Sequence, residues 1–464
     1  MYLKEILPIE SKLKFKRITL NSNNVKKNDL FIAYPPCENT NQYIKEALGK
    51  KCSCVITNHN YSNELVFKRK NLEKEIIDIF NVYYHYPLEN KNLIGVTGTD
   101  GKTTIASILK DLLKCPSIGT NGFQIDNNCY PLNNTTPRID TLYECFFKCK
   151  DYQNIVMEVS SEAYLTKRIG QLPFTIGILT NITKDHLDKH KSLKNYIYSK
   201  LELFKHSKIS ILNRDSKYYN LFKRNSIKSL SYGFSSTSDL RILKYKLYFD
   251  HSIIKIQYQN KKYTINYPLL GKFNVYNIAC CILTLLSLNY EIEDIIKRIS
   301  YIKPVIGRMN IIYDKEFKVI LDYAHTEDST KKVLTFFRQF NKNIITVVGC
   351  AGDRYKEKRK KIGRIVLKYS KFVVFTSDDP RYENPNDIIK EMISNSKKKN
   401  YFVIENRKLA IKKAINLCKK DFIILILGKG MDNYMAIENK KVPYSDFDSV
   451  LSITFENVPK FSKH

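Results

Sequence analysis

The sequence lacks the features that would place the chain in a membrane or outside the cell. No run approaches the roughly 18 uninterrupted apolar residues of a membrane-spanning helix, and the longest, Phe422–Gly428, has the length of a strand. The first residues, Met1–Glu5, contain no basic segment followed by an apolar core, as a secretory signal would. We therefore expect a soluble, cytoplasmic protein without membrane insertion.

The cysteines lack a pattern that would indicate a zinc ribbon, a redox pair or a disulfide framework. Their number, 11, is odd, and the close pairs Cys52/Cys54, Cys145/Cys149 and Cys280/Cys281 do not have CxxC spacing. We interpret them as small apolar side chains of a protein in a reducing compartment.

The chain also lacks any feature that would concentrate its positive charge into a nucleic-acid site. The net charge is +31, but the lysines are spread along the whole chain, without a long basic block, an RNP motif or a zinc finger. Tryptophan is absent while Lys, Asn, Ile and Tyr are abundant, which indicates a genome-wide compositional bias. A positive field favours small polyanionic substrates. Nucleic acid is not an expected partner.

What is present is a long globular chain of alternating short strands and helices. With 464 residues, 43% of them hydrophobic, we expect roughly two to four domains of the α/β class. We divide the chain into residues 1–88, a central block 89–306 with a parallel sheet, and a block 307–464 with a doubly wound, Rossmann-like sheet. The expected strands include Asp29–Ala33, Cys54–Thr57, Asn92–Thr97, Ile155–Val159, Ile176–Thr180, Val319–Asp322, Ile344–Gly349, Phe372–Thr376 and Phe422–Leu427.

A glycine-rich turn follows the first strand of the central block and resembles a phosphate-binding loop. Glycines allow backbone N–H groups to approach phosphate oxygens at the positive end of the next helix. Lys102 can reach the β- and γ-phosphates, and the Thr103 hydroxyl can ligate Mg²⁺; the alternative is a plain turn before an ordinary helix. Gly98 lies four residues before Lys102, which is closer than the GxxxxGK pattern requires. The expected ATP-binding residues here are Gly98, Thr99, Asp100, Gly101, Lys102, Thr103 and Thr104.

Three further polar positions follow in the central block. Glu158, at the end of an expected strand, is a plausible Mg²⁺ ligand, although a surface carboxylate is the alternative. The segment Thr180–His190 is dense in residues that can act as ligands, and its part Asp185–His190 is unusual for a loop after a strand. Lys200, taken alone, is typical of a solvated helix residue.

The compressed loop resembles the GT(N/D)GKT(S/T) loop of the Mur ligase family, and the resemblance continues across nearly the entire chain. Mur ligases form an amide bond by way of an acyl phosphate, with ATP and Mg²⁺. The resemblance implies that Glu158 binds magnesium and that His186, in a DHLDxH segment, helps to hold a second ion. Lys200, fourteen residues beyond His186, matches a lysine that CO₂ converts to a carbamate metal ligand. The matching segments are Gly98–Thr104, Asn134–Pro137, Met157–Ser161, Asp185–His190, Gly271–Asn277, Gly307–Asn310, Leu321–Glu327, Val348–Arg359 and Gly428–Asp432.

The same resemblance assigns the remaining nucleotide and precursor contacts. Asn277 would lie near the adenine, Asp322 would accept from the ribose hydroxyls, and Arg308 and His325 would lie near the phosphates. The expected contacts of the UDP-MurNAc-peptide are Ser22, Asn134, Thr135, Thr136, Ser160 and Arg168. The positions that depart from the family pattern include Glu162, Asn310, Glu327, Asp379, Met431 and Asp432.

The segment Ser377–Pro385 carries the D-x-P signature that resembles MurE-type ligases, which add the third amino acid of the cell-wall precursor. Arg381 favours meso-diaminopimelate, because a guanidinium can pair with the distal carboxylate that lysine lacks. Asp379 points to L-lysine instead, since an acid can accept its ε-ammonium. The expected amino-acid contacts are Arg354, Asp378, Asp379, Pro380, Arg381, Gly428 and Asp432.

The resemblance implies a monomeric MurE-type ligase with three domains: residues 1–88 for UDP-MurNAc, 89–306 for ATP and 307–464 for the amino acid. Lys102, Lys200, His186 and Arg308 would be the catalytic residues. Two alternatives stay open: a related ligase acting on another peptide or amine, and a non-catalytic nucleotide-binding regulator.

Overall fold

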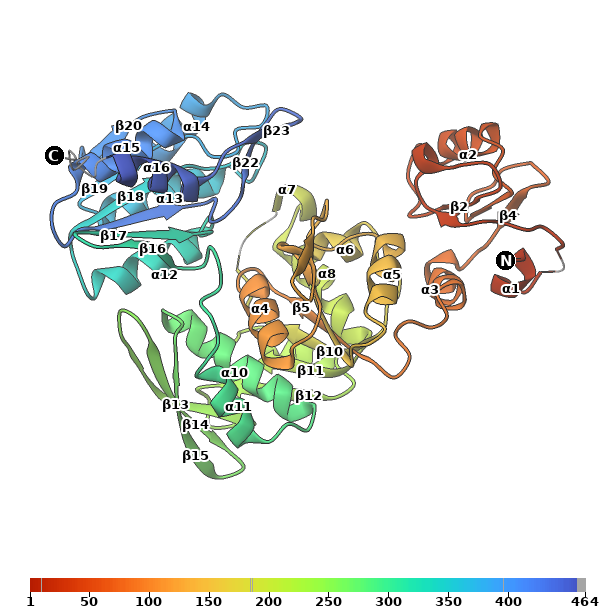
Figure 1. The fold of residues 1–464 in the computed structure, drawn as a ribbon, viewed down its shortest axis with the longest axis horizontal. Helices are drawn as coiled ribbons and strands as arrows, with labels where there is room; N and C mark the ends of the chain where they lie inside the picture. The colour runs from red at the N-terminus through yellow and green to blue at the C-terminus, as the bar shows by residue number, and fades with distance from the viewer. Residues whose placement is uncertain (10, 184, 186, 395, 457–464) are drawn as a thin grey trace, which may run out of the picture. The chain divides into compact units, whose positions relative to one another are not determined.

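The computed structural model describes residues 1–456 except 10, 184, 186 and 395, and it alternates helices and strands throughout (Figure 1). The α/β class is confirmed. The chain divides into two compact units. The first unit comprises Met1–Ile182 with Lys194–Ser231, and the second comprises Thr183–Leu193 with the chain from Tyr232 onward. The exact limits of the three expected blocks remain a prediction.

The first unit begins with a small parallel sheet in the order β1-β2-β3-β4. Phe31 and Val55 pack with Ile44 on one face of it, because successive side chains of a strand alternate between its two faces. The expected strands Asp29–Ala33 and Cys54–Thr57 are confirmed, as β2 and β3. The elements are β1 Ile18–Thr19, β2 Leu30–Ala33, α2 Thr40–Gly49, β3 Cys54–Thr57, β4 Val66–Lys68 and α3 Leu72–Tyr83.

The second sheet of this unit carries the glycine-rich loop. Its strands follow the order β11-β10-β5-β9-β6-β7-β8, and β11, β10, β5, β9 and β6 run parallel. The strands β5 and β9 are apolar almost throughout because both of their faces are covered. Parallel strands end at the same edge, so Gly98, Glu158 and Thr180 come together there. The elements are β5 Asn92–Thr97, α4 Lys102–Leu113, β6 Ser117–Gly119, β7 Gly122–Ile125, β8 Asn128–Tyr130, α5 Ile139–Lys148, β9 Asn154–Glu158, α6 Ser161–Leu165, β10 Phe174–Leu179, α8 Leu193–Lys205, β11 Ser207–Asn213 and α9 Tyr219–Arg224.

The second unit opens with an antiparallel ribbon that the sequence did not predict. The strands β13 Leu240–Leu247, β14 Ser252–Tyr258 and β15 Lys261–Tyr267 pair in order. Two helices, α10 Lys272–Ser287 and α11 Ile292–Ile299, pack on them. The boundary between the two units lies within the strand β12, Ser229–Gly233, after Ser231.

A six-stranded sheet in the order β16-β17-β21-β18-β19-β20 completes the second unit. It is parallel except for β16, and an apolar core covers each face, so the doubly wound prediction is confirmed. Helices α12, α13 and α14 contribute to one core, and α15 and α16 to the other. The elements are β16 Asn310–Asp314, β17 Lys318–Asp322, α12 Glu327–Arg338, β18 Ile344–Val348, α13 Glu357–Tyr369, β19 Phe372–Phe375, α14 Pro385–Ile393, β20 Tyr401–Val403, α15 Arg407–Leu417, β21 Ile423–Leu427, β22 Tyr434–Ile437, β23 Lys440–Pro443 and α16 Asp446–Glu456.

Two expectations about composition can be compared with the structure. All eleven cysteines are free thiols, as the sequence predicted. Within the part of the chain that the structure describes, every helix is too short or too polar to cross a membrane.

Candidate active site

The loop between β5 and α4 has the geometry of an anion-binding turn. Gly98 has a φ of 147°, and a Cβ built there would lie 1.8 Å from the Thr180 hydroxyl. Gly101, with a φ of 88°, occupies the N-cap of α4 and offers no side-chain cap. The first N–H groups of a helix have no partner within the helix, so this end can receive an anion. Only glycine fits both positions without displacing the backbone.

The carboxyl end of β10 holds this loop in place. The Thr180 hydroxyl donates to the Asp100 carbonyl at 2.6 Å, and Asn181 Nδ2 donates to the same oxygen at 2.9 Å. The Asp100 N–H donates in turn to Asn181 Oδ1 at 3.1 Å. Neither Thr180 nor Asn181 was among the expected site residues, because nothing in the sequence near them shows that they contact a loop about eighty residues away.

Two lysines donate to the carbonyl groups of the same loop. Lys102 Nζ lies 3.0 Å from the Gly98 carbonyl oxygen and 2.8 Å from that of Thr99. Lys200 Nζ, from α8, donates to the Gly98 carbonyl at 2.8 Å. The Lys200 side chain is buried, and its ammonium lies 4.5 Å from the Tyr196 ring centroid. Lys200 is therefore part of the loop environment, in contrast to the solvated position that its residue type alone favoured.

Glu158 forms the acidic centre of the site. It is 2% exposed, and its Oε2 accepts from the Thr103 hydroxyl at 2.9 Å. The Thr120 N–H donates to Oε1 at 2.9 Å and its hydroxyl to Oε2 at 3.2 Å. A Cβ on Gly119 would lie 2.4 Å from Glu158 Oε1, so the carboxylate needs glycine beside it. Thr120 is a third residue, after Thr180 and Asn181, that sequence reasoning missed.

The donors around Glu158 fit a hard divalent cation. A buried carboxylate and a threonine hydroxyl lie side by side, and Mg²⁺ prefers such oxygen ligands while keeping several of its waters. Among the residues that the structure describes, no three His, Cys, Asp or Glu side chains gather as a metal site. His186 lies outside the described residues.

The expected precursor loop borders Glu158. The Thr136 hydroxyl donates to the Glu158 carbonyl at 2.8 Å and accepts from the Ser160 N–H at 2.8 Å. Thr135 Oγ1 lies 3.2 Å from Thr120 Oγ1, and Asn134 is exposed. The structure thus brings Thr135, Thr136 and Ser160 to the acidic centre and leaves Asn134 open to a ligand.

The side chains of the other two expected precursor contacts have partners outside that loop. Arg168 is half-buried, and burial lowers the pKa of its guanidinium; its Nε donates to the Thr166 hydroxyl at 2.9 Å. The Ser22 hydroxyl donates to Glu46 Oε2 at 2.8 Å. Arg138, which was not predicted, donates through Nη1 to the Leu20 carbonyl at 3.0 Å.

In the second unit, three of the four expected nucleotide residues, Asp322, Arg308 and His325, lie near the carboxyl end of β17. Asp322 is buried, and its two oxygens accept from the N–H groups of Met309 at 2.8 Å and Ala324 at 2.7 Å. Arg308 lies beside it, with Cζ 4.4 Å from the Tyr323 ring centroid.

The remaining two nucleotide residues differ in exposure. His325 is exposed, and its Nδ1 lies 2.7 Å from the Tyr323 carbonyl oxygen. Asn277 is buried and donates to Asn274 Oδ1 at 2.8 Å.

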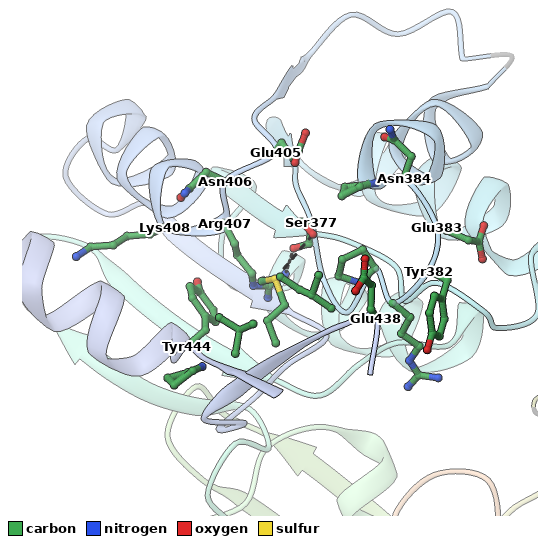
Figure 2. Close-up of a pocket in the computed structure, with 17 residues that line it drawn as sticks. Ser377, Tyr382, Glu383, Asn384, Glu405, Asn406, Arg407, Lys408, Glu438 and Tyr444 are labelled. Atoms are coloured by element: carbon green, nitrogen blue, oxygen red, sulfur yellow. Dashed lines mark hydrogen bonds between the residues drawn. The ribbon is translucent and has the colours of Figure 1, made fainter. Parts of the chain in front are cut away.

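The expected amino-acid residues are divided between two cavities of the second unit. The smaller, of about 180 Å³, has a wall that includes His325, Arg354, Asp378, Asp379, Gly428 and Asp432. The larger, of about 920 Å³, has a wall that includes Pro380, Arg381, Tyr382, Asn384, Lys408 and Glu438 (Figure 2). At the base of the larger cavity, the buried Arg407 donates through Nη1 to the Ser377 carbonyl at 3.3 Å (Figure 2).

A buried lysine holds the carboxylates of the smaller cavity. Lys429 is 1% exposed, and its Nζ lies 2.7 Å from Asp379 Oδ1. Asp378 and Asp432 each have an oxygen 3.9 Å from the same Nζ. Asp379 Oδ1 also accepts from the Ala436 N–H at 3.0 Å. The carboxylate of Asp379 is therefore engaged within the protein.

Known proteins resemble this chain over nearly its full length. The family described as Mur ligase middle domain matches residues 96–285, and that described as Mur ligase, glutamate ligase domain, matches residues 307–430. The chain is 34% identical to UDP-N-acetylmuramoyl-L-alanyl-D-glutamate–2,6-diaminopimelate ligase 2 of Clostridium acetobutylicum, covering 94% of this chain and 95% of that protein. The ligase of this name from Aquifex aeolicus is also 34% identical, over 95% and 94%. A solved structure of such a diaminopimelate ligase superposes with a TM-score of 0.71 at 26% identity, covering 98% of this chain and 99% of that one.

Proposed function

The chain belongs to the Mur ligase family, and we propose that it adds the third amino acid to UDP-MurNAc-L-Ala-D-Glu in peptidoglycan synthesis, driven by ATP. The observation that carries the proposal is the convergence of the Thr103–Glu158 pair and the buried Lys200 on the glycine-rich loop. Its substrates are small molecules, supplied in the cytoplasm, and it acts as a monomer of three domains, residues 1–88, 89–306 and 307–464.

The glycine-rich loop would bind the phosphates of ATP. Gly98 and Gly101 bring backbone N–H groups close to the anion, and Lys102 supplies a positive charge at the loop. Thr99, Asp100 and Thr104 complete this segment. From the second unit, Arg308 and His325 would approach the phosphates, Asp322 the ribose and Asn277 the adenine.

Thr103 and Glu158 would hold Mg²⁺, which supplies charge neutralisation on the phosphoryl oxygens when bound. Lys200, once carbamylated, and His186 would hold a second ion. The buried position of Lys200 beside the Gly98 carbonyl, in the same loop environment as Lys102, supports this role. The other residues of the site would orient the precursor and the amino acid relative to ATP.

The chemistry joins a carboxylate to an amine in two steps. First, an oxygen of the D-Glu γ-carboxylate attacks the γ-phosphorus of ATP, and ADP leaves as the acyl phosphate forms. The amine of the incoming amino acid then attacks the acyl carbon, loses a proton and expels inorganic phosphate. Lys102 and Arg308 would stabilise the negative charge that develops during the transfer.

The precursor peptide would lie along the loop beside Glu158. Thr135, Thr136 and Ser160 border the acidic centre there, and Asn134 offers an exposed amide. Arg168 would pair with an anionic group of the peptide, and Ser22 would contact the uridine diphosphate. This arrangement would bring the D-Glu carboxylate close to the phosphate loop.

We propose meso-diaminopimelate as the third amino acid. Asp379 is paired with Lys429 at 2.7 Å, which disfavours a role as the acceptor for a lysine ε-ammonium. Arg381 would pair with the distal carboxylate of diaminopimelate, and Arg354, Asp378, Pro380, Gly428 and Asp432 would complete the contacts. The relatives from Clostridium acetobutylicum and Aquifex aeolicus are named for the same amino acid.

Release of inorganic phosphate tests the proposal. The enzyme is given ATP, Mg²⁺ and UDP-MurNAc-L-Ala-D-Glu, with meso-diaminopimelate in one series and L-lysine in a second. Release that requires both the UDP-peptide and diaminopimelate is expected. Release with lysine only would support the ligase activity but reject the role of Arg381 in binding the distal carboxylate of diaminopimelate. Release with neither would reject the proposed function.

A further inference from the structure

Tyr323 lies between Arg308, which is expected to contact ATP, and Asp432, which is expected to contact the amino acid. Its ring centroid is 4.4 Å from the Arg308 guanidinium carbon. Its hydroxyl donates to Asp432 Oδ1 at 3.1 Å. The segment Leu321–Thr326 was singled out in the sequence for Asp322 and His325 alone, so Tyr323 has no role in the proposed ligase reaction.

Two glycines confine the ring of Tyr323. A Cβ added to Gly307 would lie 2.6 Å from the ring, and one added to Gly430 would lie 2.3 Å from it. Both glycines have positive φ values, 74° and 51°. The neighbours of Arg308 and of Asp432 in the chain therefore pack directly against the ring, which limits how far either segment can shift.

The hydroxyl of Tyr323 donates its hydrogen bond to Asp432, a largely buried carboxylate. Burial raises the pKa of Asp432, whereas Lys429 and the Tyr323 hydroxyl lower it. Burial also raises the pKa of Tyr323 well above its usual range, so its hydroxyl keeps the proton that it donates. A hydrogen bond to a charged group is stronger than one between neutral groups, so the Tyr323 hydroxyl favours one orientation of the Asp432 carboxylate.

We propose that Tyr323 is a positioning residue that serves both substrates: its ring orients Arg308 toward the nucleotide, and its hydroxyl orients Asp432 toward the ammonium group of the incoming amino acid. The inference rests on the proposed function and adds to it a physical connection between the two substrate sites. The two contacts use different parts of one side chain, so substitution can separate them.

Tyr323→Phe removes the hydroxyl and keeps the ring. We expect the KM for meso-diaminopimelate to rise about 10- to 100-fold, because a hydrogen bond to a charged group is lost. The affinity for ATP should stay unchanged. Tyr323→Leu removes the ring as well and should weaken ATP binding in addition. Tyr301→Phe is the matched control, since that tyrosine is 80% exposed.

The pH dependence provides a readout that a purely structural role would not change. Asp432 must be ionised to accept an ammonium group, and without the Tyr323 hydroxyl its pKa should rise. The charged groups that face Asp432 are Lys429, Asp378 and Asp379, and Tyr434 lies nearby; Tyr323→Phe leaves all of them in place. The rise of kcat/KM for the amino acid with pH should therefore move to higher pH in Tyr323→Phe and Tyr323→Leu, and should stay unchanged in Tyr301→Phe.

The experiment combines calorimetric titration of ATP with steady-state kinetics for the wild type, Tyr323→Phe, Tyr323→Leu and Tyr301→Phe. The inference is overturned if Tyr323→Phe keeps the wild-type KM for the amino acid, or if it weakens ATP binding as much as Tyr323→Leu does. If the wild type forms product and Tyr323→Phe has the wild-type KM for the amino acid, the inference is rejected while the proposed function stands. A wild type without product would reject the proposed function and the inference together.

Discussion

The hydroxyl of Thr103 donates to the carboxylate of Glu158 at 2.9 Å, although the two residues stand 55 positions apart in the chain. Thr103 lies in the first turn of α4 and Glu158 ends β9. The strands β5 and β9 are parallel neighbours, so the loop after β5 lies beside the end of β9. The fold itself thus brings a phosphate-binding turn and an acidic metal ligand together.

Glu158→Gln should abolish most of the activity while the fold is kept. The amide still accepts from Thr103 but carries no charge for Mg²⁺, so kcat should fall by about 100-fold or more. The measurement is phosphate release as a function of Mg²⁺ concentration. Glu64→Gln, at an exposed carboxylate of the same unit, is the control. Equal kcat values for the two variants would reject Glu158 as a metal ligand.

Lys200→Met should also be nearly inactive, because methionine fills the buried site and cannot form a carbamate. We expect a loss of about 100-fold or more in kcat. Depletion of CO₂ should lower the activity of the wild type but leave the residual activity of the variant unchanged. Lys205→Met, at an exposed lysine of the same helix, is the control. Wild-type kinetics for Lys200→Met would contradict the metal-site assignment.

Arg381→Lys keeps the positive charge but loses the planar guanidinium that can pair bidentately with a carboxylate. The KM for meso-diaminopimelate should rise about 10- to 100-fold, and that for ATP should not change. Initial rates at varied concentrations of each substrate provide the measurement. Arg364→Lys, on the exposed side of α13, is the matched control. An unchanged KM for diaminopimelate would show that Arg381 does not read the distal carboxylate.

Arg407→Met should destabilise the second unit strongly. Arg407 and Asp446 are both fully buried and pair at 2.8 Å, and Arg407 also donates to the Leu427 carbonyl at 2.9 Å. Removal of one partner leaves a buried charge and costs about 3–5 kcal/mol. For a unit of this size, the melting temperature should fall by roughly 6–20 °C.

Two further variants control for that measurement. Lys408→Met, at the exposed neighbouring position, should melt near the wild-type temperature. The double variant Arg407→Met/Asp446→Leu should recover part of the loss, because it leaves no unpaired charge. A single variant as stable as the wild type would contradict this interpretation of the buried pair.

The strands that the sequence predicted are those with continuous apolar runs. β9 and β21 are buried along their whole length, so their composition alone identified them. The ribbon β13–β15 was missed because its strands are partly exposed and carry many lysines and tyrosines. Such strands depend on pairing with their neighbours, which a single segment does not reveal.

The site was predictable where its residues are adjacent in the chain, as in Gly98–Thr104. Lys200 was assigned to the site only through the family resemblance and its spacing from His186, because its residue type alone favoured a solvated position. The structure instead buries it with Tyr196 and Phe204 on one face of α8. Thr120 and Asn181 gave no local signal. Their roles depend on contacts made by distant strand ends, which only the folded sheet defines.

The most direct test of the central claim is mass spectrometry of the nucleotide product after incubation with UDP-MurNAc-L-Ala-D-Glu, ATP, Mg²⁺ and meso-diaminopimelate. The account predicts a UDP-linked tripeptide that carries diaminopimelate, formed only when ATP is present and with one ADP for each product molecule. Recovery of the unchanged UDP-dipeptide, with ATP intact or hydrolysed, would contradict it.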